Sequence, residues 1–198
     1  MAQSIFCMYR FRILFSFAFF IGFSSFAQDL AYAKKTINTL TSKKYWGRGY
    51  TKNGMSKAAD FIANEFKNFG LSPLSGGDFK QQFSFPANTF PSKMDLKING
   101  KKLKPGKDFI VHQASKGVKT TDSLVLKDSI TYLSKNGHVI VSLAPKLTWS
   151  ASQKVLDYTI VEVAQKALTA TPKSININIE NEFVPSFTAA NVAAVIKG

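Results

Sequence analysis

The sequence predicts an α/β fold, or an α+β fold if the α/β part is truncated, and three patterns lead to this prediction. Segments with a helical period of 3.6 residues occur near the N-terminus, and segments that alternate every two residues fill the middle. The last run, residues 188–198, is apolar on both sides. Such a run suits an interior strand of a sheet covered on both faces. A C-terminal edge strand docked on the β-rich middle is the alternative, because short apolar runs are ambiguous.

The first 27 residues have the pattern of a secretory signal peptide. Two basic residues, Arg10 and Arg12, precede an apolar run at 13–23, and the small residues Ser25 and Ala27 follow at positions −3 and −1 of a cleavage site. The run is short of the roughly 20 residues that span a bilayer, which favours a cleaved signal over a membrane anchor. We therefore expect an exported protein, periplasmic or extracellular, with no integral membrane segment after cleavage.

Cysteine usage limits the chemistry of the mature chain. Cys7 is the only cysteine and lies inside the signal segment. An exported chain without cysteine cannot build a disulfide framework, a cysteine-ligated zinc site or a thiol nucleophile. A metal would have to be held by carboxylates and by His112 and His138, the only histidines.

The chain is strongly basic, with a formal net charge of +14, yet the pattern argues against nucleic acid. After the signal segment Arg48 is the only arginine, and arginine supplies the bidentate fork that phosphate and guanine recognition favour. The lysines are spread along the chain, and the densest stretch, 93–107, has the pattern of a hairpin with outward-facing lysines. Adhesion to nucleic acid or to an anionic envelope would require the lysines to cluster in space.

Two amphipathic helices are predicted before residue 70. In the first, over 29–41, Leu30, Ile37 and other apolar residues lie three or four positions apart. The second begins after Asn53-Gly54, and its apolar residues form one stripe to Phe69. Gly70 is placed to end it, with a proline just beyond.

The middle of the chain predicts strands and one more helix. The run 79–85 and the run 94–98 alternate, and Asn99-Gly100 directly after the second is a strong hairpin signal. Further strands are expected at 109–111, 123–126, 130–133, 139–143 and 174–179. The apolar spacing over 150–168 predicts a long helix that Thr171-Pro172 stops.

No catalytic, cofactor-binding or metal-binding residue is predicted in this chain. Neither His112 nor His138 lies in an H-E-x-x-H pattern, and no G-x-S-x-G sequence occurs. Gly47-Arg48-Gly49 is the only G-x-G, and it lacks the third glycine of a dinucleotide-binding loop. Glu65 and Glu162 lie on the polar sides of predicted helices, where solvation is the default.

Several spaced motifs nevertheless resemble the N-terminal region of exported di-zinc aminopeptidases, the family that also contains glutamate carboxypeptidase II and the transferrin-receptor ectodomain. The resemblance covers about residues 30–85 and 187–198, and it rests on motifs that recur in the family's order. They are Tyr32-Ala33, Thr36-Ile37, Leu40-Thr41, Gly47-Arg48-Gly49-Tyr50, Gly54, Ala58-Ala59-Asp60-Phe61-Ile62, Phe66, Gly70-Leu71, Pro73, Phe79, Gln82-Phe83, and Asn191-Val192-Ala193-Ala194-Val195-Ile196-Lys197-Gly198.

The resemblance implies a divided organisation. We expect a signal peptide at 1–27, the N-terminal helical part of a peptidase domain at 28–85, a β-rich insertion at 86–186 that resembles a protease-associated lid, and the first strand of the truncated peptidase domain at 187–198. In the family such an insertion shapes the substrate entrance. No contact residue can be assigned to it, and Trp149 is expected to serve packing.

The resemblance also implies what this chain lacks. In the family two zinc ions activate water to attack the N-terminal peptide bond of a peptide or protein substrate, and the ligands include an H-x-D segment and a Glu-Glu pair. Neither motif occurs here, and Gly198 falls just before the place of the first. We therefore expect an N-terminal fragment of a secreted zinc aminopeptidase, inactive alone and without a cofactor of its own. The alternative is a complete exported binding or accessory module without catalytic activity.

Overall fold

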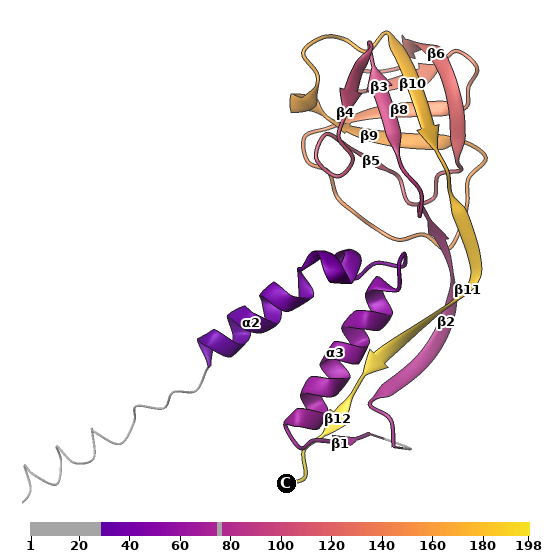
Figure 1. Cartoon of the computed structure of the whole chain (residues 1–198). Helices are drawn as coiled ribbons and strands as arrows, with labels where there is room; N and C mark the ends of the chain where they lie inside the picture. Colours follow the sequence, from indigo (N-terminus) through magenta and orange to yellow (C-terminus); the bar gives the residue numbers. More distant parts are fainter. Residues whose placement is uncertain (1–28, 75–76) are drawn as a thin grey trace, which may run out of the picture. The chain divides into compact units, whose positions relative to one another are not determined.

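The computed structural model describes residues 29–74 and 77–198, and the predicted signal segment lies outside them. The chain divides into two units at Leu40. The described part of the first unit is helix α2, Leu30–Leu40 (Figure 1). Asp29 caps it, because its Oδ1 accepts a hydrogen bond of 2.9 Å from the backbone N–H of Tyr32. The first predicted helix is thus confirmed.

The second unit opens with a short 3-10 segment, η1 (Lys43–Arg48), and helix α3 (Gly54–Asn68). Helix α3 confirms the second prediction, including its end. Gly70 takes a φ of +71°, and its N–H and that of Leu71 bond to the carbonyls of Lys67 and Phe66. Left-handed glycine after the last turn satisfies carbonyls that the helix itself leaves open.

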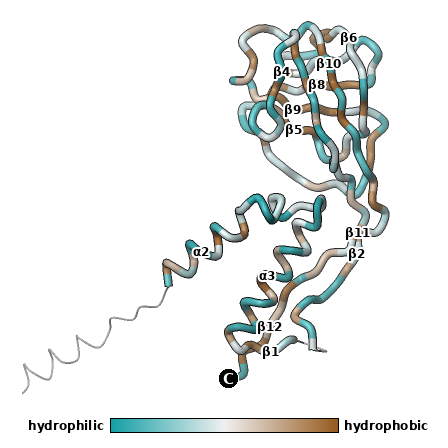
Figure 2. The backbone as a smooth tube through the Cα atoms, viewed as in Figure 1, coloured by the Kyte–Doolittle hydropathy of each residue, from teal (hydrophilic) through white to brown (hydrophobic). Residues whose placement is uncertain are grey.

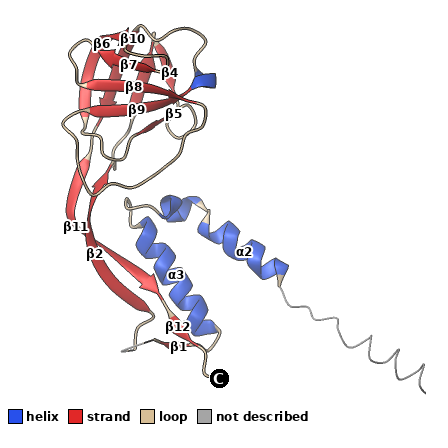
Figure 3. Ribbon diagram, turned by 180° about the vertical axis from the view of Figure 1, so that it is seen from behind, coloured by secondary structure: helices blue, strands red, loops and turns tan. Residues whose placement is uncertain are grey.

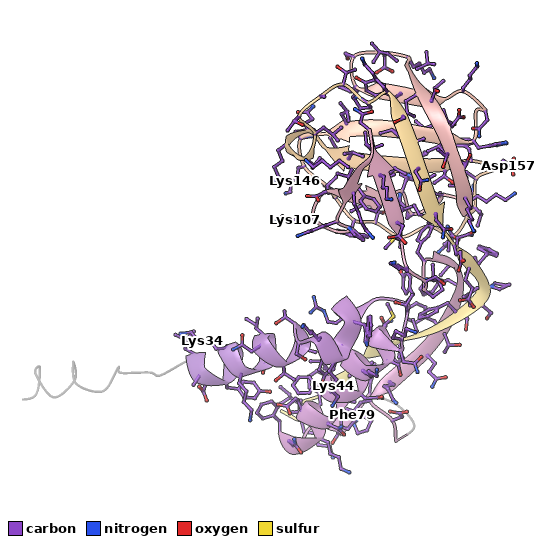
Figure 4. All side chains as sticks on the ribbon, turned by 45° about the horizontal axis from the view of Figure 1, so that its top comes forward. Lys34, Lys44, Phe79, Lys107, Lys146 and Asp157 are labelled. Carbon is purple, nitrogen blue, oxygen red and sulfur yellow. The ribbon has the colours of Figure 1, made fainter. Side chains whose placement is uncertain are left out.

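Next to α3 runs a long two-stranded ribbon that joins distant parts of the sequence. Strand β2 (Lys80–Thr89) pairs antiparallel with β11 (Glu182–Val192), with an irregularity in register between Val184 and Phe187. At the far end of the ribbon, β1 (Ser72–Pro73) pairs with β12 (Ala194–Val195). Figure 3 shows both strands of the ribbon continuing into the strand-rich part of the chain.

That part, here called the β-domain, spans residues 90–181 between the two ribbon strands and is built on one eight-stranded sheet. The sheet has the order β4-β3-β10-β6-β7-β8-β9-β5 and is nearly closed on itself. All neighbours are antiparallel except β8 and β9. Its strands are β3 (Asp95–Ile98), β4 (Lys101–Leu103), β5 (Phe109–Val111), β6 (Val118–Leu126), β7 (Thr131–Ser134), β8 (Val139–Ala144), β9 (Thr159–Ala164) and β10 (Ser174–Ile179).

The core of the β-domain lies inside this curved sheet. Hydrophobic and hydrophilic residues alternate along its strands, as the brown and teal bands on the backbone in Figure 2 show. The fully buried members are Leu96, Ile98, Leu103, Phe109, Val139, Val141, Val161, Val163, Ile175, Ile177 and Ile179. A second short 3-10 turn, η2 (Gln165–Ala167), adds the buried Ala167 to this core.

The predicted α/β class is wrong, because the described chain is mostly β and its large sheet is not layered between helices. The helix predicted over 150–168 is absent from the described structure: a loop covers its first half, and β9 and η2 take the rest. Thr159, Val161 and Val163 are buried in alternation, and β-branched residues favour this extended, half-buried surface. The apolar residues are spaced as in a helix, yet this segment forms a strand that pairs in parallel with β8.

The terminal apolar run also differs from its prediction. In the described structure β11 is paired with β2 alone and β12 with β1 alone, so neither is an interior strand. Each of these strands has a neighbour on one side only, and Ile196, which follows β12, is exposed.

Candidate functional site

The turn before α3 is the most unusual backbone of the described chain. Trp46, Arg48, Lys52 and Asn53 all take left-handed conformations, with φ between +47° and +58°. Such conformations cost free energy in non-glycine residues and gather at binding and switch sites. The Trp46 side chain is 57% exposed, which places a large ring on the surface at a strained position.

Gly54 lets the backbone of this turn lie very close to the start of α3. A Cβ atom at this position would lie 2.6 Å from the carbonyl oxygen of Tyr45 and 3.0 Å from that of Gly49. The N–H of Met55 donates to the same Gly49 oxygen at 2.9 Å. The close approach of turn and helix therefore requires glycine.

An aromatic cluster lies on the ribbon beside the turn. The ring of Tyr50 is 4.8 Å from that of Phe187 and 5.7 Å from that of Phe85. Phe83 stacks on Phe85 with ring centres 5.8 Å apart and is 44% exposed. These ring contacts pack the turn against the ribbon, and the exposed part of Phe83 adds an apolar surface there.

Two hollows lie near α3, a small cavity beside the ribbon and an open groove along the C-terminal half of the helix. A cavity of about 70 Å³ between α3 and the ribbon is lined by Met55, Ala59, Gln82, Ala189 and their neighbours, whereas ligand pockets usually measure about 300–1,000 Å³. The second hollow is a shallow groove at the C-terminal half of α3. There Lys80 and Asp60 form an ion pair at 2.9 Å, and this hydrogen bond raises the pKa of the Lys80 ammonium.

The two histidines lie on either side of β9 and do not form a site with carboxylates. The N–H of His112 donates to the carbonyl of Ile160, and the carbonyl of His138 accepts from Thr159. The His112 ring is engaged locally, with Nδ1 accepting from the N–H of Ala114 at 3.3 Å. Over residues 29–74 and 77–198, no three His, Cys, Asp or Glu side chains are placed to hold a metal ion. The described residues therefore do not fit the two zinc ions that the resemblance implies.

None of the helices that the structure describes combines the length and the apolar character needed to cross a bilayer.

Sequence reasoning missed the aromatic cluster as a unit. Phe83 and Phe85 were expected on one side of a strand, but Tyr50 and Phe187 join them only through the pairing of β2 with β11. The alternation of residues 79–85 predicted a strand, but it could not show that β11 would be the strand paired with it.

Comparison with known protein families found no match, and comparison with curated proteins found none. Among solved structures, an aminopeptidase from Aneurinibacillus sp. strain AM-1 is similar at 17% sequence identity, with a TM-score of 0.44. The similarity covers 81% of this chain and 46% of that chain. This chain thus spans less than half the length of that aminopeptidase.

Proposed function

We propose that this chain is part of an exported zinc-dependent aminopeptidase, in which it supplies a β-rich lid and the helix and ribbon that carry it. The metal ligands would come from parts of the enzyme outside the described residues. The observation that carries the proposal is the pairing of residues far apart in sequence. Strand β1 meets β12, and β2 meets β11, so the β-domain leaves and re-enters one assembled base.

This arrangement is what an insertion requires. The base, here α3 and the ribbon with β1 and β12, contains the parts of the family-like segments that belong to the second unit, 41–85 and 187–198. The β-domain has a hydrophobic core of its own. A domain with its own core can be inserted between two paired strands without disturbing either partner. The exposed Trp46 and Phe83 on the base offer apolar surface for a peptide side chain.

The test begins with the reading frame that encodes this chain. We expect the frame to continue past Gly198 into an H-x-D segment and a Glu-Glu pair. The complete product should hydrolyse amino-acid p-nitroanilides, lose this activity in EDTA and recover it with zinc. The 198-residue chain alone should show no zinc-dependent hydrolysis.

Two results would contradict the proposal. One is a stop codon directly after Gly198 in well-assembled genomic sequence, which would favour a non-catalytic binding or accessory module. The other is EDTA-sensitive turnover by the 198-residue chain itself, since the described residues offer no metal site.

A further inference from the structure

The outer face of four neighbouring strands, β4, β3, β10 and β6, gathers lysines that are scattered in sequence. Register places Lys102 opposite Lys97, Lys97 opposite Asn176, and Asn176 opposite Thr121. The next row holds Asp95, Asn178 and Lys119 in the same order. At about 4.8 Å between strands, a row of four positions spans about 14 Å. We call Lys93, Lys97, Lys102 and Lys119 the lysine face.

The charges of this face are only partly balanced. Asp95 holds two of the lysines, with Lys102 Nζ at 2.9 Å from Oδ1 and Lys93 Nζ at 3.1 Å from Oδ2. Glu180, exposed just after β10, is the other acid at the border of the face. Lys97 and Lys119 are exposed and form no ion pair with any described residue. The face therefore keeps a positive excess.

Lys97 lies directly opposite Lys102, and the ion pair of Lys102 with Asp95 offsets part of the repulsion between the two ammonium groups. Like charges directly opposite each other on antiparallel strands destabilise the pair, and a Glu at either position would relieve this. The turn residues of the same hairpin are close to ideal, with Asn99 at φ +51° and Gly100 at φ +78°. A lysine opposite a lysine on an otherwise well-formed hairpin is an arrangement that an anionic partner would stabilise.

The shape of the face limits what that partner is. The face is the open, convex outer side of a nearly closed sheet, and the hollows near α3 are lined by other residues. Its rows contain no aromatic ring on which a base could stack and no arginine to grip a phosphate in two places. Flexible lysine stems instead suit a broad anionic surface that is held by charge alone.

We propose that the lysine face lies against the surface of an anionic lipid bilayer. The protein would then be attached peripherally, by attraction between the four ammonium groups and lipid phosphates. Each lysine near such a surface changes binding by roughly fivefold at moderate salt. Because the interaction is screened over about 8 Å at physiological ionic strength, binding should fall steeply as salt rises.

The experiment measures partition of the chain onto lipid vesicles by co-sedimentation at 50 mM salt. Vesicles of phosphatidylcholine with one quarter phosphatidylglycerol are compared with vesicles of phosphatidylcholine alone. The ratio of the two partition coefficients is the readout, since the apolar run at 13–23 contributes to both. We expect the ratio for Lys97→Gln/Lys119→Gln to fall about 25-fold, roughly fivefold for each lysine removed. The matched control, Lys127→Gln/Lys154→Gln, removes two exposed lysines from loops and should stay within about twofold.

Three outcomes would overturn the proposal. The unaltered chain might show no preference for anionic vesicles, or the control variant might lose as much binding as the face variant. A 20-nucleotide oligothymidylate that binds more tightly than the vesicles and displaces them would indicate nucleic acid instead. None of these measurements uses peptide hydrolysis, so the proposed function stands or fails separately.

Discussion

Asn181 donates a hydrogen bond of 2.8 Å from Nδ2 to Oδ1 of Asn88, where the two ribbon strands enter the β-domain. Asn88 is buried, and its Nδ2 donates to the carbonyls of Gln113 and Ser115 at 2.9 and 2.8 Å. The Oδ1 of Asn181 accepts from the N–H of Gly117 at 2.8 Å. Two side-chain amides thus bind the ribbon to the loop after β5.

Replacing Asn88 by alanine should lower the free energy of unfolding by about 2–3 kcal/mol, because buried carbonyls and the Asn181 amide lose their partners. Asn181→Ala should cost less, about 1 kcal/mol, since Asn181 is half-buried and water can replace it. Urea denaturation followed by fluorescence measures both. Asn64→Ala, on the exposed side of α3, is the control and should change stability by less than about 0.5 kcal/mol. A change that small for Asn88→Ala would show that this junction is not structural.

Gly54→Ala should destabilise the base by about 1–3 kcal/mol, because its Cβ would meet the backbone oxygens of Tyr45 and Gly49 at 2.6 and 3.0 Å. Backbone atoms cannot move aside as a flexible side chain can. Gly49→Ala is the matched control in the same turn. Its φ of −88° suits any residue, and the nearest atom to its Cβ would be 3.6 Å away. Thermal unfolding should show a lower Tm for the first variant and an unchanged or slightly higher one for the second; equal losses would contradict the close-approach argument.

Local patterns predicted much of the fold, and long-range pairing explains most of what they missed. The two helices, the Asn99-Gly100 turn and the strands β8 and β10 follow from signals a few residues apart. The prediction of a helix at 150–168 was wrong. Its β-branched residues have a spacing that fits a helix, but they form β9, which pairs in parallel with β8. The predicted α/β class was wrong in part for the same reason, because a strand replaced one of the expected helices.

The candidate sites depended on partners that no local signal identifies. Asn88 and Asn181 are 93 positions apart, and Phe187 reaches Tyr50 only through the ribbon. For the lysine face, sequence reasoning placed the lysines of the hairpin outward, and the structure confirms this for Lys97 and Lys102. The arrival of Lys119 on the same face required the pairing of β10 with β6.

Asp128 should make the β6–β7 turn sensitive to acid. The backbone N–H of Ile130, at 3.0 Å from Oδ1, is the main cause that holds the pKa of Asp128 below its ordinary value, and Thr131 adds to it. A carboxylate whose pKa is lowered by folding contributes stability above its unfolded pKa, and this is lost as pH falls through the folded value. The stability that the Asp128 carboxylate contributes should therefore be lost below about pH 4.

Asp128→Asn tests this assignment because the amide keeps an acceptor oxygen for both N–H groups but does not titrate. We expect the variant to lose less Tm than the unaltered chain between pH 5 and pH 3. Asp157→Asn, at an exposed loop position, is the control for removing a carboxylate elsewhere on the surface. Parallel pH profiles for all three proteins would refute a role for the Asp128 charge.

Lys97→Glu should stabilise the protein while it weakens attachment to anionic vesicles. The new carboxylate would lie opposite Lys102, so a like-charge cross-strand pair becomes an attractive one. Because Asp95 already pairs with Lys102, the gain belongs at the lower end of the usual range, about 0.2–0.5 kcal/mol. Lys97→Gln, which removes the repulsion without adding attraction, should fall between the two in urea denaturation. In 1 M salt, where the screening length is about 3 Å, the differences should shrink. If Lys97→Glu raises the unfolding midpoint and weakens vesicle binding, Lys97 serves binding and not folding. If it lowers the midpoint, Lys97 does not repel Lys102 and this argument for a binding role fails.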